Sequence, residues 1–286
     1  MRQLEIAPKT RVRNLEVPSF FYGTAWKEDK TAELVLQALR AGYRAVDTAN
    51  QRKHYFEAGA GDGIAKFMKE SKANRGSLFL QTKFTYARGQ DHRLPYDPEA
   101  SLTKQVQQSI ASSLGHLQTD YIDSYVLHGP ATGMGLTDDD FEVWQTMEAL
   151  VDAGKTRLIG ISNVTYEQLA TLLQKARVKP AFVQNRCFAS SKWDKRIREL
   201  CAKHELRYQG FSLLTANMAH LHHPTIKSIM LRTKKSIPQI VFRFAMQQGM
   251  IPLTGTKDAQ HMEEDLQIFD FELTGDETDS IENIAF

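Results

Sequence analysis

The stretch Tyr121-Ile122-Asp123-Ser124-Tyr125-Val126-Leu127-His128-Gly129-Pro130 decides the fold. Residues 121–127 are a short, largely apolar run with the length of a buried strand, and the Gly-Pro pair prevents its continuation. His128 therefore stands where a predicted strand ends. In a barrel of parallel strands, the C-terminal ends of the strands carry the chemistry. The stretch predicts a buried parallel strand with a functional histidine at its end.

Three other apolar runs also finish in polar residues. One ends at Asp47, one at Lys83 and one at Ser162-Asn163. Taken alone, each has a plainer explanation, such as a strand-end cap or a surface ion pair. With His128 they give an aspartate, a lysine, a histidine and a Ser-Asn pair at successive strand ends, and this pattern indicates one shared site.

Strand-like runs alternate with helix-like runs along the chain. Apolar residues at helical spacing fill the segments between the strands. Residues 1–19 are polar and mixed, and we expect no element there. The expected strands are residues 20–26, 43–48, 78–84, 121–127, 157–161, 181–184, 206–214 and 250–253.

Local signals predict where several helices begin. Asp97-Pro98 is a typical start, with aspartate as the N-cap and proline in the first turn. Thr165 with Gln168, and Thr274 with Glu277, have the spacing of a capping box. These signals predict helices after residues 97, 165 and 274.

Eight strand–helix alternations in 286 residues predict an α/β protein, a (β/α)8 TIM barrel forming a single domain over residues 1–286. A doubly wound open sheet is the alternative. Its usual dinucleotide fingerprint, G-x-G-x-x-G after the first strand, does not occur in this sequence. The barrel is therefore the favoured architecture.

Composition excludes several classes of protein. The formal net charge is +2, with acidic and basic residues mixed along the chain, so we expect no nucleic-acid partner. Two cysteines, Cys187 and Cys201, do not make a disulfide framework. Residues 1–6 lack a signal-peptide core, and no stretch approaches a membrane span. We expect a cytoplasmic protein with no membrane partner.

Four motifs together resemble the aldo-keto reductase family. The resemblance runs from about Phe20 to about Leu266, which is most of the chain. Any one of the motifs is weak evidence, but all four occur in the right order at the right strand ends. They are Gly42-Tyr43-Arg44-Ala45-Val46-Asp47-Thr48-Ala49, Gln81-Thr82-Lys83, Leu127-His128-Gly129-Pro130 and Gly160-Ile161-Ser162-Asn163.

The resemblance implies a catalytic tetrad of Asp47, Tyr55, Lys83 and His128. The family's tyrosine usually follows the aspartate by five positions, where this chain has Arg52. Tyr55 instead precedes Phe56-Glu57-Ala58-Gly59, much as the family's tyrosine precedes its helix. We therefore infer a short insertion, residues 50–54, before the catalytic tyrosine.

These residue types suit carbonyl reduction, which needs a hydride on carbon and a proton on oxygen. Tyrosine has an ordinary pKa of about 10 and is a poor acid at neutral pH. We expect the Lys83 ammonium to favour the phenolate of Tyr55 and ease proton release, with Asp47 pairing that ammonium. His128 is expected to hydrogen-bond the substrate oxygen or assist proton transfer.

The resemblance also implies a nicotinamide cofactor, NADPH, with NADH possible. Lys257 and the helix start after it are expected to favour NADPH by holding a 2′-phosphate. The implied cofactor-binding residues are Ser162, Asn163, Gln184, Phe211, Ser212, Leu214, Gly255, Thr256, Lys257 and Asp265. The implied substrate-pocket residues are Trp26, Phe56 and Tyr86.

The leading function is an NADPH-dependent oxidoreductase that reduces aldehydes or ketones to alcohols by hydride transfer, with Tyr55 as general acid. A nucleotide-binding regulatory or sensor subunit with little turnover is the alternative. A non-redox barrel enzyme such as an isomerase is a third possibility. The histidines at 220, 222 and 223 lack an evident third ligand, so we expect no metal site. The oligomeric state stays open.

Overall fold

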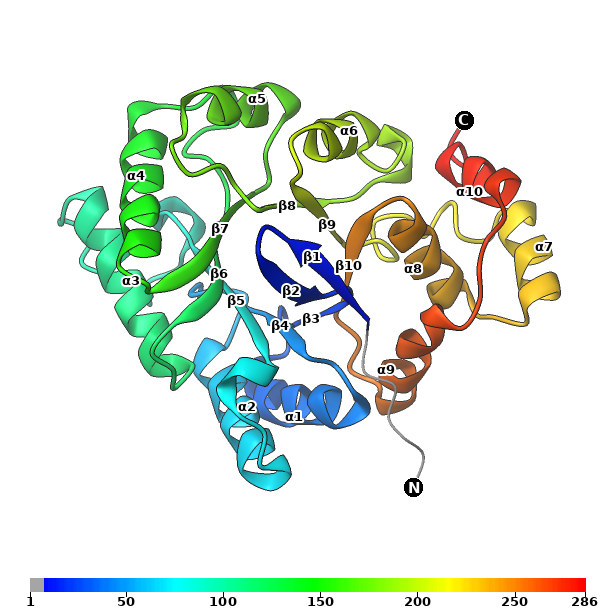
Figure 1. The fold of residues 1–286 in the computed structure, drawn as a ribbon, viewed down its shortest axis with the longest axis horizontal. Helices are drawn as coiled ribbons and strands as arrows, with labels where there is room; N and C mark the ends of the chain where they lie inside the picture. Colours follow the sequence, from blue (N-terminus) through cyan, green and yellow to red (C-terminus); the bar gives the residue numbers. More distant parts are fainter. Residues whose placement is uncertain (1–7) are drawn as a thin grey trace.

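A closed barrel of parallel strands forms the centre of the molecule (Figure 1). The computed structural model describes residues 8–286. Within these residues, the barrel strands follow one another in the order β10-β3-β4-β5-β6-β7-β8-β9, and helices surround them. The prediction of a (β/α)8 barrel is confirmed, and the doubly wound alternative is wrong because the sheet closes on itself.

The strands and helices alternate as the sequence predicts. The strands are β1 (Lys9–Val12), β2 (Leu15–Pro18), β3 (Phe21–Gly23), β4 (Ala45–Asp47), β5 (Phe79–Phe84), β6 (Ile122–Leu127), β7 (Thr156–Ser162), β8 (Phe182–Arg186), β9 (Arg207–Phe211) and β10 (Met250–Thr254). The helices are α1 (Thr31–Ala41), α2 (Glu57–Ser71), α3 (Leu102–His116), α4 (Asp138–Asp152), α5 (Tyr166–Lys175), α6 (Lys195–Lys203), α7 (Pro224–Thr233), α8 (Ile237–Gln247), α9 (Ala259–Asp265) and α10 (Gly275–Glu282).

Strand register brings the predicted strand ends to one level. In the parallel pairing of β5 with β6, Lys83 lies opposite Val126 and Phe84 opposite Leu127. Asp47 at the end of β4 lies opposite Gln81 of β5. Every residue of β4, β5 and β6 is buried, as expected for strands covered on both faces. The polar residues that follow these strands therefore meet at one end of the barrel.

A hairpin that the sequence analysis missed closes the opposite end of the barrel. β1 and β2 pair antiparallel, and Figure 1 shows them lying across the barrel opening. Val12 and Val17 of the hairpin are buried in a cluster with Phe79 and Phe182 from the barrel strands. The hairpin exposes most of its polar residues, so residues 9–18 show only a short, broken apolar pattern in the sequence.

One predicted helix start is wrong, and two capping boxes are confirmed. α3 begins at Leu102 with Ser101 as its N-cap, not at Asp97-Pro98. The Asp97 carboxylate instead accepts from the backbone N–H of Glu99 at 3.0 Å, which makes a local turn. The boxes at 165–168 and 274–277 both form, and they begin α5 and α10.

In the part of the chain that the structure describes, no helix is long and apolar enough to cross a membrane. The expectation about a signal peptide concerns residues 1–6, which lie outside the described residues.

Candidate active site

A large cavity opens at the C-terminal end of the barrel strands, with a volume of about 1510 Å³. It brings together most of the residues singled out from the sequence. Those that line it are Trp26, Asp47, Tyr55, Tyr86, His128, Asn163, Gln184, Phe211, Ser212, Leu214, Gly255, Thr256, Lys257 and Asp265. Lys83 and Ser162 are fully buried just beneath the cavity. Phe56 lies elsewhere: it lines a second cavity of about 280 Å³ beside the first.

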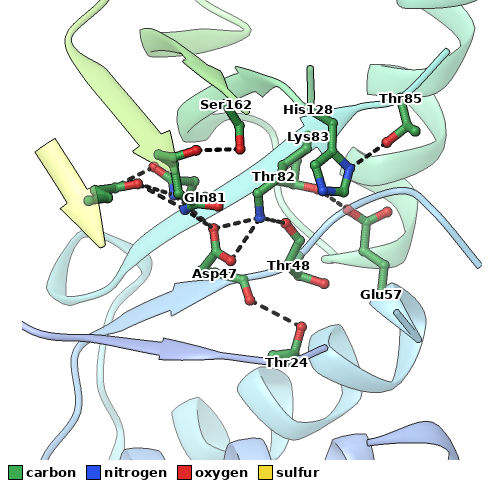
Figure 2. Close-up of polar contacts among 12 residues, drawn as sticks. Thr24, Asp47, Thr48, Glu57, Gln81, Thr82, Lys83, Thr85, His128 and Ser162 are labelled. Atoms are coloured by element: carbon green, nitrogen blue, oxygen red, sulfur yellow. Dashed lines mark hydrogen bonds and ion pairs between the residues drawn. The ribbon is translucent and has the colours of Figure 1, made fainter. Parts of the chain in front are cut away.

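Asp47 and Lys83 form a buried ion pair at the floor of the cavity (Figure 2). Lys83 Nζ donates to both carboxylate oxygens of Asp47 at 2.7 Å and to the backbone oxygen of Thr48 at 2.8 Å. An ammonium group has three N–H donors, so these contacts use all of them. Burial lowers the pKa of Lys83, although the neighbouring Asp47 carboxylate raises it.

A layer of glutamine side chains supports Asp47 from below. Nε2 of Gln81 and Nε2 of Gln184 donate to Asp47 Oδ1 at 2.7 and 3.0 Å. Both amides also donate to Gln209 Oε1, at 2.8 and 2.9 Å. These bonds replace the water that the buried carboxylate has lost. The sequence analysis gave no role to Gln81 or Gln209, although a glutamine inside an apolar strand run was the available signal.

Tyr55 lines the cavity and directly follows residues 50–54. Its backbone N–H donates to the carbonyl of Gln51 at 2.9 Å, so this segment ends in a tight turn just before the tyrosine. The centroid of the Tyr55 ring lies 5.9 Å from that of His128 and 5.2 Å from Lys83 Nζ. Among residues 8–286, Tyr55 Oη has no hydrogen-bond partner. The phenol is therefore free to bind a group in the cavity.

The expectation that Lys83 lowers the pKa of Tyr55 is wrong for this chain. Burial raises the pKa of Tyr55 well above its usual value, and the Asp47 carboxylate raises it further. The Lys83 ammonium does not reverse this shift, and it is held against both oxygens of Asp47. Tyr55 is consequently a neutral phenol, able to give a proton, at neutral pH.

His128 is a neutral imidazole whose tautomer depends on Thr85. Burial, then Lys83 and His54, lower the pKa of His128 to about 3. Nδ1 of His128 lies 2.7 Å from Thr85 Oγ1 (Figure 2). Thr85 is buried, and its hydroxyl has no other acceptor in the described chain, so its O–H donates to Nδ1. The ring proton then sits on Nε2, which makes His128 a hydrogen-bond donor toward the cavity.

Without the Thr85 hydroxyl, we expect the ring proton of His128 to be no longer confined to Nε2. In Thr85→Val, which keeps the shape of the side chain, we expect kcat/KM for carbonyl reduction to fall about tenfold, the effect of one hydrogen bond. Thr85→Ser keeps the hydroxyl and should retain most of the activity. Steady-state kinetics of both variants would check this. Equal activity of the valine and serine variants would mean that Thr85 does not control His128.

Two amide oxygens face the cavity without partners. Asn163 Nδ2 donates to the carbonyl of His128 at 2.7 Å. Both N–H groups of Gln184 also donate, one to Asp47 and one to Gln209. Within residues 8–286, Asn163 Oδ1 and Gln184 Oε1 accept no hydrogen bond. The hydroxyl proton of Ser162 is not available to a ligand, since it is donated to the carbonyl of Gln184 at 2.6 Å. Two free acceptors side by side suit a ligand with a primary amide N–H₂ group.

Backbone strain concentrates on the cavity rim. Trp26, Asn163 and Ser212 all have left-handed backbones, with φ of 61°, 54° and 55°. A bulky residue such as tryptophan rarely adopts this conformation, and such strain collects at functional sites. The three positions lie after β3, β7 and β9, where each chain turns out of the barrel.

Lys257 lines the far end of the cavity next to Gly255, and Lys27 bonds to Gly255 without being part of the cavity lining. Lys257 is exposed, whereas Lys27 is buried and its Nζ donates to the carbonyl of Gly255 at 2.8 Å. Burial and the charge of Lys257 lower the pKa of Lys27 to about 8. The sequence analysis missed Lys27. Asp265, expected to bind cofactor, is buried nearby; burial raises the pKa of its carboxyl to about 7.

The helix after Lys257 is not the free phosphate site that the sequence suggested. α9 has seven residues, and its N-cap Asp258 already accepts from the backbone N–H of His261 at 3.0 Å. An aspartate cap satisfies the donors and places a negative charge where an anion would sit. The N-terminus of α9 is therefore not an open anion site.

Comparisons with known proteins agree on one family. The profile of the Aldo/keto reductase family matches residues 19–285. A glyoxal reductase of Bacillus subtilis (strain 168) is 30% identical over 270 residues, covering 94% of this chain and 89% of that protein. The uncharacterized oxidoreductase YtbE of the same organism is 29% identical over 278 residues, covering 96% and 92%. The crystal structure of an aldo/keto reductase from Brucella melitensis superimposes with a TM-score of 0.81 at 27% identity, covering 97% of this chain and 99% of that one.

Proposed function

The chain belongs to the aldo/keto reductase family of oxidoreductases, and on that premise we propose that it reduces aldehydes or ketones to alcohols with NADPH. One observation carries the proposal. Tyr55 Oη and His128 Nε2 are free, their rings are 5.9 Å apart, and both line one cavity. Two hydrogen-bond donors in one cavity suit a carbonyl oxygen, which accepts two hydrogen bonds.

In the proposed reaction, the nicotinamide supplies the hydride. His128 Nε2–H holds the carbonyl oxygen and polarises the carbonyl bond. Tyr55 gives the proton from Oη to that oxygen as the alkoxide forms. Lys83 then acts on the phenolate that remains, because its ammonium lies 5.2 Å from the ring centroid. Asp47 and its glutamine layer keep that ammonium charged and in place.

The cavity residues fit the cofactor that this reaction needs. The free acceptors Asn163 Oδ1 and Gln184 Oε1 match the two N–H donors of a carboxamide. The half-buried ring of Phe211 would stack against a flat heterocycle, and Ser212 and Leu214 follow it at the rim. Lys257 and Lys27 supply positive charge for phosphate groups at the far end.

Preference for NADPH over NADH is expected to depend on Lys257. In Lys257→Ala we expect the dissociation constant for NADPH to rise about tenfold, since a charged hydrogen bond to the 2′-phosphate is lost. The constant for NADH should change little. Fluorescence titration of both cofactors would check this, with Lys203→Ala on α6 as a surface-charge control. Equal affinity of the unaltered protein for the two cofactors would contradict a 2′-phosphate site.

The pH profile of reduction is expected to be flat across the neutral range. Tyr55 must be protonated, and its raised pKa keeps it so; His128 must be neutral, and its pKa of about 3 keeps it so. For benzaldehyde at saturating NADPH, kcat/KM should be constant from about pH 5 to beyond about pH 10, the ordinary pKa of tyrosine. A bell-shaped pH profile of kcat/KM with an acid limb near pH 6.5 would show that a group other than Tyr55 and His128 controls the rate.

A panel of aldehydes and ketones tests the proposed function. NADPH oxidation followed by absorbance should give turnover with several of them, glyoxal among them because a relative carries that activity in its name. Binding of NADPH without turnover of any panel member would favour the alternative, a regulatory or sensor subunit. No binding of NADPH or NADH would favour a non-redox barrel enzyme.

A further inference from the structure

His54, in the inserted segment, forms part of the cavity wall. Its ring stacks on the exposed Trp26 with centroids 4.1 Å apart, and its carbonyl accepts from the Trp26 backbone N–H at 2.8 Å. Nδ1 of His54 lies 2.9 Å from Gln51 Oε1. His54 and His128 both line this cavity. The proposed reaction gives no role to His54.

The hydrogen bonds around Gln51 fix the tautomer of His54. Gln51 Nε2 donates to the carbonyl of Gly89 at 2.6 Å, and a carbonyl can only accept. The amide nitrogen of Gln51 must therefore face Gly89, which leaves its oxygen facing His54. Because that oxygen can also only accept, Nδ1 of His54 must carry the proton and donate it.

His54 Nε2 is consequently a bare acceptor. Burial, then the charge of Lys53, lower the pKa of His54 below its usual value, although Asp91 and Glu28 raise it. The ring is therefore neutral above its ordinary pKa of about 6.5 and carries its only N–H proton on Nδ1. In the part of the chain described, no donor reaches Nε2. His128 in the same cavity has the opposite tautomer, with its proton on Nε2.

We propose that His54 Nε2 accepts a hydrogen bond from a hydroxyl group of the substrate, so that the preferred substrates are hydroxylated aldehydes or ketones. This inference rests on the proposed carbonyl reduction and names its substrate class. His128 and Tyr55 donate to the carbonyl oxygen, and His54 accepts from a hydroxyl elsewhere on the same molecule. A site that must bond a hydroxyl discriminates against analogues that lack it, because its own polar group is then left unpaired.

A purely structural His54 would behave differently. Its contacts with Trp26 and Gln51 would only hold the segment 50–54 in place. Loss of those contacts would lower kcat/KM for all substrates alike. A hydroxyl acceptor affects only substrates that carry a hydroxyl. The ratio of kcat/KM for a substrate with a hydroxyl to kcat/KM for a matched substrate without one therefore separates the two roles.

The test compares 3-hydroxybenzaldehyde with 3-methoxybenzaldehyde, because the methoxy group keeps the oxygen but cannot donate. We expect the unaltered protein to favour the hydroxyl compound about tenfold in kcat/KM. His54→Phe keeps a ring against Trp26 but removes the acceptor, and the ratio should fall to about one. His92→Phe, on an exposed histidine of the neighbouring loop, should keep the ratio of the unaltered protein. No preference in the unaltered protein, or a preference that survives His54→Phe, would overturn the proposal.

The tautomer can be measured without any reaction. ¹⁵N NMR of histidine-labelled protein, with His54 assigned by its loss in His54→Phe, should show a protonated Nδ1 and a bare Nε2. A protonated Nε2 would overturn the inference even if aldehydes are reduced. Failure of the protein to reduce any aldehyde would instead contradict the proposed function. The ¹⁵N spectrum would still report the tautomer of His54 independently of that result.

Discussion

Tyr55→Phe is expected to lower kcat for carbonyl reduction about 10²–10⁴-fold, the usual contribution of a well-placed general acid. Tyr55 Oη is a neutral phenol in the cavity, and burial keeps it protonated at neutral pH. The substitution removes only the hydroxyl, which makes no hydrogen bond to Asn163 or Gln184, the amides proposed to bind the cofactor. The dissociation constant of NADPH should therefore stay within about twofold, a change of less than about 0.5 kcal/mol.

Tyr121→Phe provides the matched control for this experiment. Tyr121 lies just before β6, at the opposite end of that strand from His128, and its ring packs under the guanidinium groups of Arg75 and Arg157. Its variant should retain full kcat. If Tyr55→Phe also keeps a near-normal kcat, residues 50–54 do not precede the proton donor, and another group in the cavity protonates the alkoxide.

Lys83→Met is expected to lower the free energy of unfolding by about 3–5 kcal/mol, besides removing most of the turnover. Lys83 is fully buried, and its ammonium is the only cation bonded to the Asp47 carboxylate in the chain from residue 8 onward. Without it, Asp47 keeps its glutamine donors but remains a buried charge without a counter-ion. Denaturant unfolding of purified protein would measure the difference.

Two further variants separate this electrostatic effect from loss of packing. The double variant Asp47→Asn with Lys83→Met removes the stranded charge and should recover a large part of the lost stability. Arg40→Met breaks an ion pair with Glu70 on the protein surface and should cost less than about 1 kcal/mol. A double variant no more stable than Lys83→Met alone would mean that packing, and not the unpaired carboxylate, sets the cost.

The barrel could be predicted because its signals are local. The run before His128 ends in Gly-Pro, and similar runs end at Asp47 and Lys83, so strand number and strand ends follow from the sequence. The hairpin at residues 9–18 could not be predicted, because few of its residues are buried and the partners of Val12 and Val17 lie on distant barrel strands. Burial of that kind leaves no periodic pattern.

Most of the residues that line the cavity were predicted from the sequence, but their hydrogen bonds were not. Thr85 lies 43 positions from His128 in sequence, and only the register of β5 with β6 brings their side chains together. The register of β4 with β5 brings Lys83 to Asp47 and Thr48, and burial of Tyr55 in the same site raises its pKa instead of lowering it. Short motifs fix which groups are present, whereas the strand register fixes what each one bonds.

Transfer of deuterium from labelled NADPH to a carbonyl carbon tests the central claim most directly. The protein would be incubated with NADPH deuterated on the transferred position of the nicotinamide and with 3-hydroxybenzaldehyde, and the alcohol analysed by mass spectrometry and NMR. The account predicts one deuterium on the carbinol carbon of the product, with turnover that Tyr55→Phe removes. An unlabelled alcohol, or no alcohol while NADPH binds normally, would contradict it.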